Sequence, residues 1–299
     1  MHVAGRLLLM AVCAVASAGC ASAQVGGNQA DGSSQTAGQM VEVGGRRLRL
    51  NCMGERVSGS PTVVLESGFG SDASVWSKVQ PEVLKFTRVC SYDRAGLGAS
   101  QPAPASPRTV VAVTEELHAL LAAAKVPAPY VLVGHSLGGM LARVYASYYP
   151  AEVVGMVLVD SAHEDEADRG VALMPQEMLK ELLRTARPED LKVQGGEAID
   201  TCALRPLMNA LNWRADIPLV VLTQGIPYRA EDYTTPALAP KYYQLHLELQ
   251  KELVGRSRKG RQVIAEKSGH FIHQDQPELV IAAIRQVIAE AQTKTVRPN

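Results

Sequence analysis

Short apolar runs alternate with helical segments along most of the chain. The runs are rich in Val, Ile and Leu, and most of them end in Gly, Ser or Asp. They read PTVVLESG, TRVCSYDRAG, YVLVGHS, VVGMVLVDS, IPLVVLTQG and RQVIAEKSG. Nearly continuous apolar runs separated by helices are typical of parallel strands that are covered on both faces. The pattern therefore predicts an α/β fold.

The segment MVEVGGRRLRLNCMG precedes these runs and has a different pattern. It alternates apolar and polar residues on both sides of Gly44 and Gly45, as a hairpin does. Together the segments predict about eight strands in one doubly wound sheet, antiparallel at its start and parallel afterwards. The clearest covering helices are TVVAVTEELHALLAAAK and DQPELVIAAIRQVIAEAQ. We expect a single domain over residues 40–299.

The longest interruption of this pattern separates VVGMVLVDS from IPLVVLTQG. Within it, PQEMLKELLRTARPEDLKVQ has a helical pattern, and loops of this length without structure of their own are uncommon in compact domains. We therefore expect a small helical cap over about residues 161–216. It would cover the carboxyl ends of the strands, where ligands bind in open α/β sheets.

The first 23 residues have the layout of a secretory signal peptide, with Arg6, an apolar run and then small residues. The run is too short to span a membrane. Cleavage after Ala23 is the favoured outcome, and lipid attachment at Cys20 is the alternative. Residues 24–39 are rich in Gly, Ser and Gln, which predicts a disordered linker. The sequence thus predicts an exported protein, periplasmic or secreted, with a lipoprotein as the alternative.

Charge and cysteine content narrow the classes of function. Lys plus Arg equals Asp plus Glu at 30 each, without a long basic run, so we expect no nucleic-acid partner. The sequence has no Cys/His cluster typical of a zinc site and no phosphate-binding loop, so we expect no metal and no cofactor. Removal of the signal leaves Cys52, Cys90 and Cys202, an odd number that leaves at least one thiol outside any intrachain disulfide.

Ser136 lies at a turn between the strand-like YVLV and the helical LGGMLARVYASYY. Gly134 and Gly138 flank it at two residues on either side, which is the nucleophile-elbow pattern G-x-S-x-G. The sharp turn needs small neighbours and lifts the hydroxyl clear of the sheet, next to a helix N-terminus. This pattern predicts a nucleophilic serine.

With LESGFGSDASVW, YDRAGLGAS, GHSLGG, LVLVDSAHED and SGHFIHQDQPELV in this order, the chain resembles the α/β-hydrolase superfamily, specifically its bacterial serine esterase and lipase-like members. The resemblance covers nearly all of residues 40–292. It implies an eight-stranded, mostly parallel sheet with helices on both faces and a variable cap, in agreement with the hydrophobic pattern.

A serine hydroxyl needs a base, usually a histidine that a carboxylate orients. His270 follows the last strand-like run and matches the family's base, with His273 as the alternative. We expect His118 and His246 on helix surfaces. His135, next to the serine, is expected to point away from it and to pack the elbow.

The triad acid of the family usually follows the seventh strand, but Tyr228 occupies that place here. A known variation of the family puts the acid at the end of the sixth strand, where this chain has Asp160. Ser136, Asp160 and His270 then keep the family's order of nucleophile, acid and base. Asp232 and Glu231 are the alternatives.

The resemblance implies further roles around the serine. The N–H groups of Leu137 and Phe69 would form the oxyanion hole, although the family more often has His-Gly where this chain has Ser67-Gly68. Asp93 and Arg94 are expected to form an internal ion pair that braces nearby loops. Cys52 and Cys90 would fall on adjacent strands of the fold, and we predict a disulfide between them.

These expectations amount to an exported serine hydrolase that cleaves a small or medium carboxylic ester, its small-molecule acyl substrate, through Ser136, His270 and Asp160. A serine at the elbow argues against epoxide hydrolysis and dehalogenation, which use an aspartate in this family. Amide, thioester and carbon–carbon bonds stay open as targets. Two other classes also stay open: a weakly active ligand-binding protein, because the usual acid position is empty, and a cell-envelope attachment protein. The sequence leaves the natural substrate and the oligomeric state open.

Overall fold

The computed structural model describes residues 38–55, 57–103, 108–185, 197, 199–200, 204–211, 213–232 and 235–295. The predicted signal peptide, nearly all of the predicted linker and Cys202 lie outside these residues. The first strand already begins at Gln39, the last residue assigned to the linker. None of the described helices is long and apolar enough to cross a membrane.

Eight strands form one sheet in the order β1-β2-β4-β3-β5-β6-β7-β8. The strands are β1 (Gln39–Val43), β2 (Arg46–Met53), β3 (Thr62–Glu66), β4 (Val89–Tyr92), β5 (Tyr130–His135), β6 (Val153–Val159), β7 (Leu219–Gln224) and β8 (Gly260–Ala265). β2 pairs antiparallel with β1 and with β4, and every other neighbouring pair is parallel. The predicted mostly parallel sheet with an antiparallel start is confirmed.

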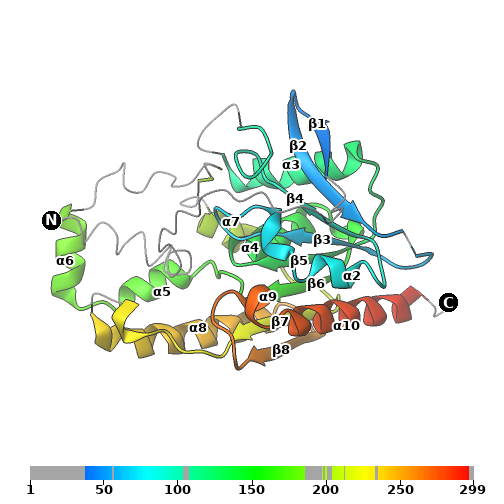
Figure 1. Cartoon of the computed structure of the whole chain (residues 1–299). Coiled ribbons are helices and arrows are strands. Elements are labelled where there is room, and N and C mark those ends of the chain that lie inside the picture. The colour runs from blue at the N-terminus through cyan, green and yellow to red at the C-terminus, as the bar shows by residue number, and fades with distance from the viewer. Residues whose placement is uncertain are drawn as a thin grey trace, which may run out of the picture.

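The helices follow the order of the strands and cover the sheet (Figure 1). They are α2 (Gln80–Val83), α3 (Val110–Ala123), α4 (Leu137–Tyr148), α5 (Glu166–Ala172), α6 (Gln176–Thr185), α7 (Leu204–Leu211), α8 (Ala239–Val254), α9 (Ile272–Asp275) and α10 (Pro277–Thr295). The side chain of Thr109 caps α3 by accepting from the N–H of Ala112 at 3.1 Å. α10 begins at Pro277, whose fixed φ suits the first turn of a helix.

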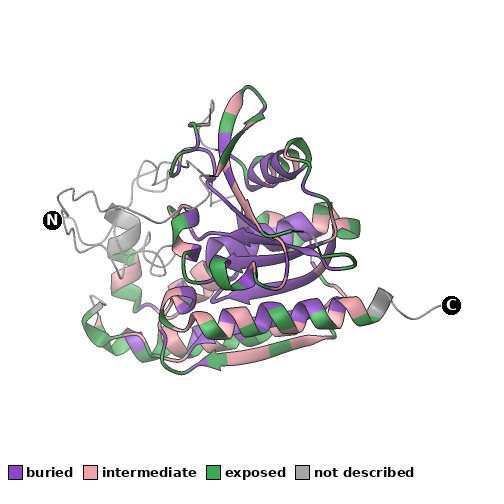
Figure 2. Cartoon of the chain, turned by 45° about the vertical axis from the view of Figure 1, so that its right-hand side comes forward, coloured by how far each residue is buried: buried purple, intermediate pink, exposed green. Residues whose placement is uncertain are grey.

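The core has two layers, one on each face of the sheet, because successive strand residues point to opposite faces. In β6, Met156 and Leu158 join one buried cluster, which includes side chains of α3, α4 and α8. Val157 and Val159 join the other, with side chains of α2 and α10. Figure 2 shows the buried central strands between the half-exposed helices. This two-sided burial explains the continuous apolar runs in the sequence.

The described residues between β6 and β7 include the helices α5, α6 and α7, in agreement with the predicted small helical cap. α5 and α6 lie at the side of the molecule opposite the C-terminal end of α10 (Figure 1). α5 packs against α8, and its Arg169 pairs with Glu248 and Glu252 of that helix at 3.0 and 2.6 Å. The start of the cap is thereby fixed to α8.

Cys52 of β2 and Cys90 of β4 stand opposite each other in the antiparallel register. The two cysteines, 38 residues apart in sequence, form a disulfide that links these strands. The pairing expected from the fold is present in the structure.

Candidate active site

Ser136 lies between the end of β5 and the first residue of α4, with φ 54° and ψ −122°. Left-handed backbone of this kind is strained for a residue other than glycine. The turn is tight because α4 passes close to the sheet. A Cβ on Gly134 would lie 2.4 Å from the oxygen of Gly138, and a Cβ on Gly138 would lie 2.4 Å from the oxygen of Glu66. Both flanking glycines are therefore required for the elbow, as its pattern predicted.

Asp160 follows β6, the strand next to β5. His135 and Val159 are paired in register, so Ser136 and Asp160 emerge at the same edge of the sheet. Asp160 also has left-handed backbone, with φ 43°, and is 1% exposed. Its Oδ1 accepts from the N–H of Gln224 at 2.9 Å. The carboxylate is thus buried and anchored to the end of β7.

His270 lies in the loop between β8 and α9, and its Nδ1 is 2.7 Å from Oδ2 of Asp160. An ionised carboxylate only accepts hydrogen bonds, so Nδ1 carries the proton. The tautomer that remains has an unprotonated Nε2, which can accept the proton of a hydroxyl group. The histidine predicted as the base and the aspartate predicted as the acid are therefore in direct contact.

His135 connects the elbow to this histidine. Its Nε2 is 3.0 Å from the main-chain oxygen of His270, and the two rings lie 4.5 Å apart. The side chain is 2% exposed and packs beneath the turn, and burial, followed by the charges of His270 and His273, holds its pKa well below the usual value. A neutral His135 can therefore hold the loop that carries His270.

His246 of α8 was expected on a helix surface, and this expectation is wrong. Its side chain is 4% exposed, and its Nε2 is 2.9 Å from Oδ1 of Asp160. The sequence did hold a signal for this. His246, Leu249, Gln250 and Leu253 recur at helical spacing, and all four are buried on the face of α8 that packs on the sheet.

Both histidines act on the acid. Burial by itself would raise the pKa of Asp160, but the charge and hydrogen bond of His246, and then the contacts of His270, hold it below its usual value. Burial by itself would lower the pKa of His246, but the charge and hydrogen bond of Asp160 raise it overall. Asp160 is therefore an ionised carboxylate between two imidazole donors.

His273 and Glu231, two of the alternatives named for base and acid, occupy other positions. His273 is 0% exposed and packs against Trp76, and neither of its ring nitrogens has a hydrogen-bond partner among the described residues. Its pKa is lowered to about 3 by burial and by His270. Glu231 is 72% exposed and pairs with Arg229 at 3.1 Å. The side chain of Asp232 lies outside the description.

The loop after β3 lies directly against the elbow. A Cβ on Gly68 would lie 3.3 Å from Cβ of Ser136 and 2.8 Å from Nδ1 of His135. Phe69 follows and packs with Leu137 in the apolar cluster between α4 and α7. As the first residue of α4, Leu137 has a main-chain N–H without an intrahelical partner. The two residues predicted to donate to an oxyanion thus flank the serine.

Arg94 holds this loop in place. Its guanidinium, 1% exposed, donates to the main-chain oxygens of Ser67 and Gly68 at 2.7 and 2.6 Å. It also pairs with Glu66 of β3 and with Glu197 of the cap segment, each at 2.6 Å.

Arg94 and Asp93 were expected to pair with each other, and this detail is wrong. Asp93 instead accepts from the N–H groups of Ala73 and Ala99, both at 2.9 Å, and lies 3.6 Å from Arg49. Successive residues after a strand point in different directions, so each meets its own loop. Both residues nevertheless brace loops near the serine.

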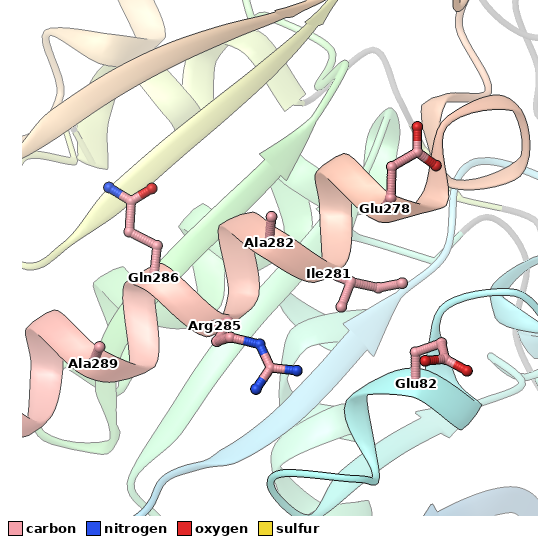
Figure 3. Close-up of a pocket in the computed structure, with 7 residues that line it drawn as sticks. All are labelled: Glu82, Glu278, Ile281, Ala282, Arg285, Gln286 and Ala289. Carbon is pink, nitrogen blue, oxygen red and sulfur yellow. The ribbon is translucent and has the colours of Figure 1, made fainter.

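Among the described residues, no cluster of three or more His, Cys, Asp or Glu is arranged to hold a metal ion. A surface hollow lies between α2 and α10, where Glu82 faces residues of α10 (Figure 3). The α10 residues that line it are Glu278, Ile281, Ala282, Arg285, Gln286 and Ala289. They include no nucleophile and no imidazole, and none comes from the edge that carries Ser136.

Taken together, Ser136 in strained backbone and the buried Asp160 in contact with His270 lie at one edge of the sheet. This arrangement can carry out nucleophilic catalysis with a covalent intermediate. Main-chain N–H groups beside the serine can stabilise negative charge on a bound carbonyl oxygen.

Two relatives match this chain over most of their length. YqjL of Bacillus subtilis is 30% identical over 230 residues, which cover 77% of this chain and 84% of YqjL. An AB hydrolase superfamily protein of Gibberella zeae is 26% identical over 278 residues, covering 76% of this chain and 86% of that protein.

Solved structures share the fold at lower identity. A thermophilic esterase from Thermogutta terrifontis superposes with a TM-score of 0.57 at 20% identity, covering 86% of this chain and 98% of the esterase. A meta-cleavage product hydrolase from Pseudomonas fluorescens superposes with a TM-score of 0.59 at 15% identity, covering 84% and 98%. A sequence profile described as alpha/beta hydrolase fold matches residues 61–282. The chain therefore belongs to the α/β-hydrolase fold family.

Proposed function

We propose that this α/β hydrolase is an exported serine hydrolase that cleaves a small or medium carboxylic ester. The observation that carries the proposal is the 2.7 Å contact between His270 Nδ1 and Asp160 Oδ2, at the sheet edge where Ser136 stands in strained backbone. Nucleophile, base and acid follow three different strands, which is how the triad of this fold is built.

The reaction would begin with attack of Ser136 Oγ on the ester carbonyl carbon, while His270 Nε2 takes the hydroxyl proton. The carbonyl oxygen becomes negatively charged and is held by the N–H groups of Leu137 and Phe69. Asp160 stabilises the imidazolium and keeps the ring in the required tautomer. When the ester C–O bond breaks, His270 returns the proton to the leaving alcohol.

The acyl group is then bound to Ser136 as an ester. A water molecule gives its proton to His270 Nε2 and attacks the acyl carbon, and collapse of the second tetrahedral intermediate releases the acid. The proton returns to Ser136 Oγ, which restores the enzyme. No metal or organic cofactor takes part in these steps, and each proton transfer uses the same imidazole nitrogen.

The ester is favoured over other acyl bonds because a structural neighbour is an esterase. Another neighbour is a meta-cleavage product hydrolase, so a carbon–carbon bond is the second candidate. The alternative of a ligand-binding protein rested on the empty acid position after β7. The contact of Asp160 with His270 weakens that argument. Export rests on the signal-like first residues.

The test is hydrolysis of p-nitrophenyl acetate, butyrate and octanoate by a protein that begins at residue 24. We expect Ser136→Ala to abolish turnover and Asp160→Asn to lower kcat about a thousandfold or more, because the wrong tautomer of His270 results. Glu231→Gln is the matched control and should keep the full rate. Equal rates of the unmodified protein and Ser136→Ala would refute the proposal, and the chain-length preference would give the size of the acyl site.

A further inference from the structure

We propose that His246 is a positioning residue for the catalytic acid. It fixes one oxygen of Asp160 so that the other faces His270, and its charge sets the pH of the acidic limb of the pH–rate profile. The inference rests on the proposed function of Ser136, His270 and Asp160, and it adds a fourth side chain from an element that supplies none of the three.

The two oxygens of Asp160 have different partners. Oδ2 is bonded to Nδ1 of His270 at 2.7 Å, whereas Oδ1 receives Nε2 of His246 and the N–H of Gln224, both at 2.9 Å. The two donors on Oδ1 stop rotation of the carboxylate about its Cβ–Cγ bond. Without His246, Oδ1 would keep only the main-chain donor of Gln224 among the described residues.

His246 is itself held firmly. It lies in the middle of α8 (Ala239–Val254), where Leu249 and Leu253 of the same helix face are also buried, and Leu253 belongs to the core cluster on the sheet. The ring of Tyr228 lies 5.8 Å from the ring of His246 on another side. A side chain packed in this way can impose an orientation on Asp160, because it cannot follow the carboxylate if that group moves.

The charge of His246 depends on the groups that face it. Asp160 from the end of β6 and Glu166 from α5 act on its charge, and the ring of Tyr228 from the loop after β7 lies 5.8 Å from its ring. His270 from the loop after β8 acts on the same two carboxyl groups, and Tyr243 of α8 contacts Tyr228. Tyr243 is occupied as a donor to the oxygen of Gly225 at 3.0 Å.

The two carboxylates outweigh burial in this set. Burial by itself would lower the pKa of His246, but Asp160 and then Glu166 raise it overall, although burial raises the pKa of Glu166 as well. His246 therefore holds its proton more strongly than a free histidine.

A protonated His246 has a consequence for catalysis. It shares Asp160 with His270, so its positive charge opposes the imidazolium that forms when His270 takes the serine proton. Removal of the charge without removal of the hydrogen bond should therefore shift the acidic limb of the pH–rate profile to higher pH.

Two substitutions separate these roles. His246→Gln keeps an N–H donor near the position of Nε2 and removes the charge, whereas His246→Phe keeps the ring and removes both. His118→Gln is the control, because His118 is a half-exposed histidine of α3 that pairs with Glu152. Each protein is assayed for p-nitrophenyl butyrate hydrolysis and for the rate at which a fluorophosphonate labels Ser136, both from pH 5 to pH 9.

For His246→Phe we expect kcat to fall about tenfold or more, with KM within about twofold, because a misplaced acid affects the chemical step rather than binding. For His246→Gln we expect nearly full kcat at pH 8 and an acidic limb displaced upward by about half a pH unit or more. The rates of fluorophosphonate labelling should follow the same pattern. They measure how readily Ser136 reacts with His270 as its base, and they do not depend on release of a product.

The inference is overturned if both variants keep the profile of the unmodified protein, or if they lose stability while the acidic limb stays in place. If His246→Phe does not fold, the acidic limb of the pH–rate profile of His246→Gln alone decides between these outcomes. Failure of the proposed function looks different: Ser136→Ala would then hydrolyse the ester as fast as the unmodified protein, which would remove the basis of both proposals.

Discussion

Arg94 donates from Nη2 to the main-chain oxygen of Gly68 at 2.6 Å, one residue before the proposed oxyanion donor Phe69. On the other side of Phe69, the N–H of Gly70 donates to Oε1 of Glu197 at 2.6 Å. Arg94 and Glu197 also bond to each other at 2.6 Å. The buried Arg94–Glu197 ion pair therefore holds the main chain on both sides of Phe69. Glu197 belongs to the cap segment.

Arg94→Lys should lower kcat about tenfold while KM changes little. Lysine keeps the charge but cannot reproduce the planar set of donors that reaches two carbonyls and two carboxylates. Loss of a complete oxyanion donor costs about a hundredfold or more, so a displaced donor should cost less. The measurement is steady-state ester hydrolysis, together with a thermal melt to verify folding. Arg285→Lys, on the exposed face of α10, is the control. A folded Arg94→Lys protein with full kcat would show that the contacts of Arg94 with the loop after β3 have no role in catalysis.

Gly138→Ala should destabilise the protein by about 3 kcal/mol, because overpacking against a rigid neighbour is costly. Its Cβ would lie 2.4 Å from the main-chain oxygen of Glu66, which is fixed in β3. The displaced start of α4 should also lower activity, since Leu137 and Ser136 precede Gly138 directly. Urea unfolding followed by circular dichroism measures the first effect and ester hydrolysis measures the second.

Gly269→Ala is the matched control for this prediction. It is next to His270, but nothing lies within 4 Å of its added Cβ. Its stability should stay within about 0.5 kcal/mol of the unmodified protein. Equal stability of the two variants would mean that α4 and β3 can separate without cost.

His273→Phe should make the protein less sensitive to acid. The pKa of His273 is about 3, lowered by burial and by His270, whereas a histidine in the unfolded chain titrates near about 6.5. Below that unfolded value the unfolded state binds the proton first, so stability is lost as the pH falls from about 6.5 towards about 3. A phenylalanine packed against Trp76 does not bind a proton in either state. Between pH 7 and pH 5, the free energy of unfolding of His273→Phe should therefore fall by about 2 kcal/mol less than that of the unmodified protein.

Urea titrations at pH 7 and pH 5 measure this difference, and hydrolysis at pH 8 is measured alongside. His273 makes no contact with Asp160 in the structure, so His273→Phe should keep most of its activity. An unchanged loss of stability between the two pH values would show that His273 does not stay neutral on folding. Loss of turnover in a folded variant would reopen the question of which histidine is the base.

Local patterns made the sheet and the elbow predictable. The continuous apolar run of β6 indicated a strand with two buried faces, and its residues do alternate between the two core clusters. Gly134 and Gly138 indicated a tight turn at Ser136; Gly134 is required by the close approach of β5 to α4, and Gly138 by that of α4 to β3. Each of these features depends on residues within a few positions of one another.

The surroundings of the acid were less predictable. The spacing of His246, Leu249 and Leu253 indicates a buried helix face, but periodicity does not indicate which group a histidine on that face contacts. The partners of Arg94 were missed for a related reason. Glu66 and Glu197 are 28 and 103 residues away from it, so no spacing in the sequence could indicate the pairing.

The sequence by itself determined the strands, the elbow serine and the positions of Asp160 and His270 at strand ends, because hydrophobic period and turn chemistry are local properties of the chain. Only the tertiary structure decided that Asp160 lies between His270 and His246, which are 110 and 86 residues away, and that Arg94 connects the oxyanion loop to the cap. Such contacts arise when strand order and helix packing bring distant segments together, and a buried carboxylate then takes whichever donors the packing supplies.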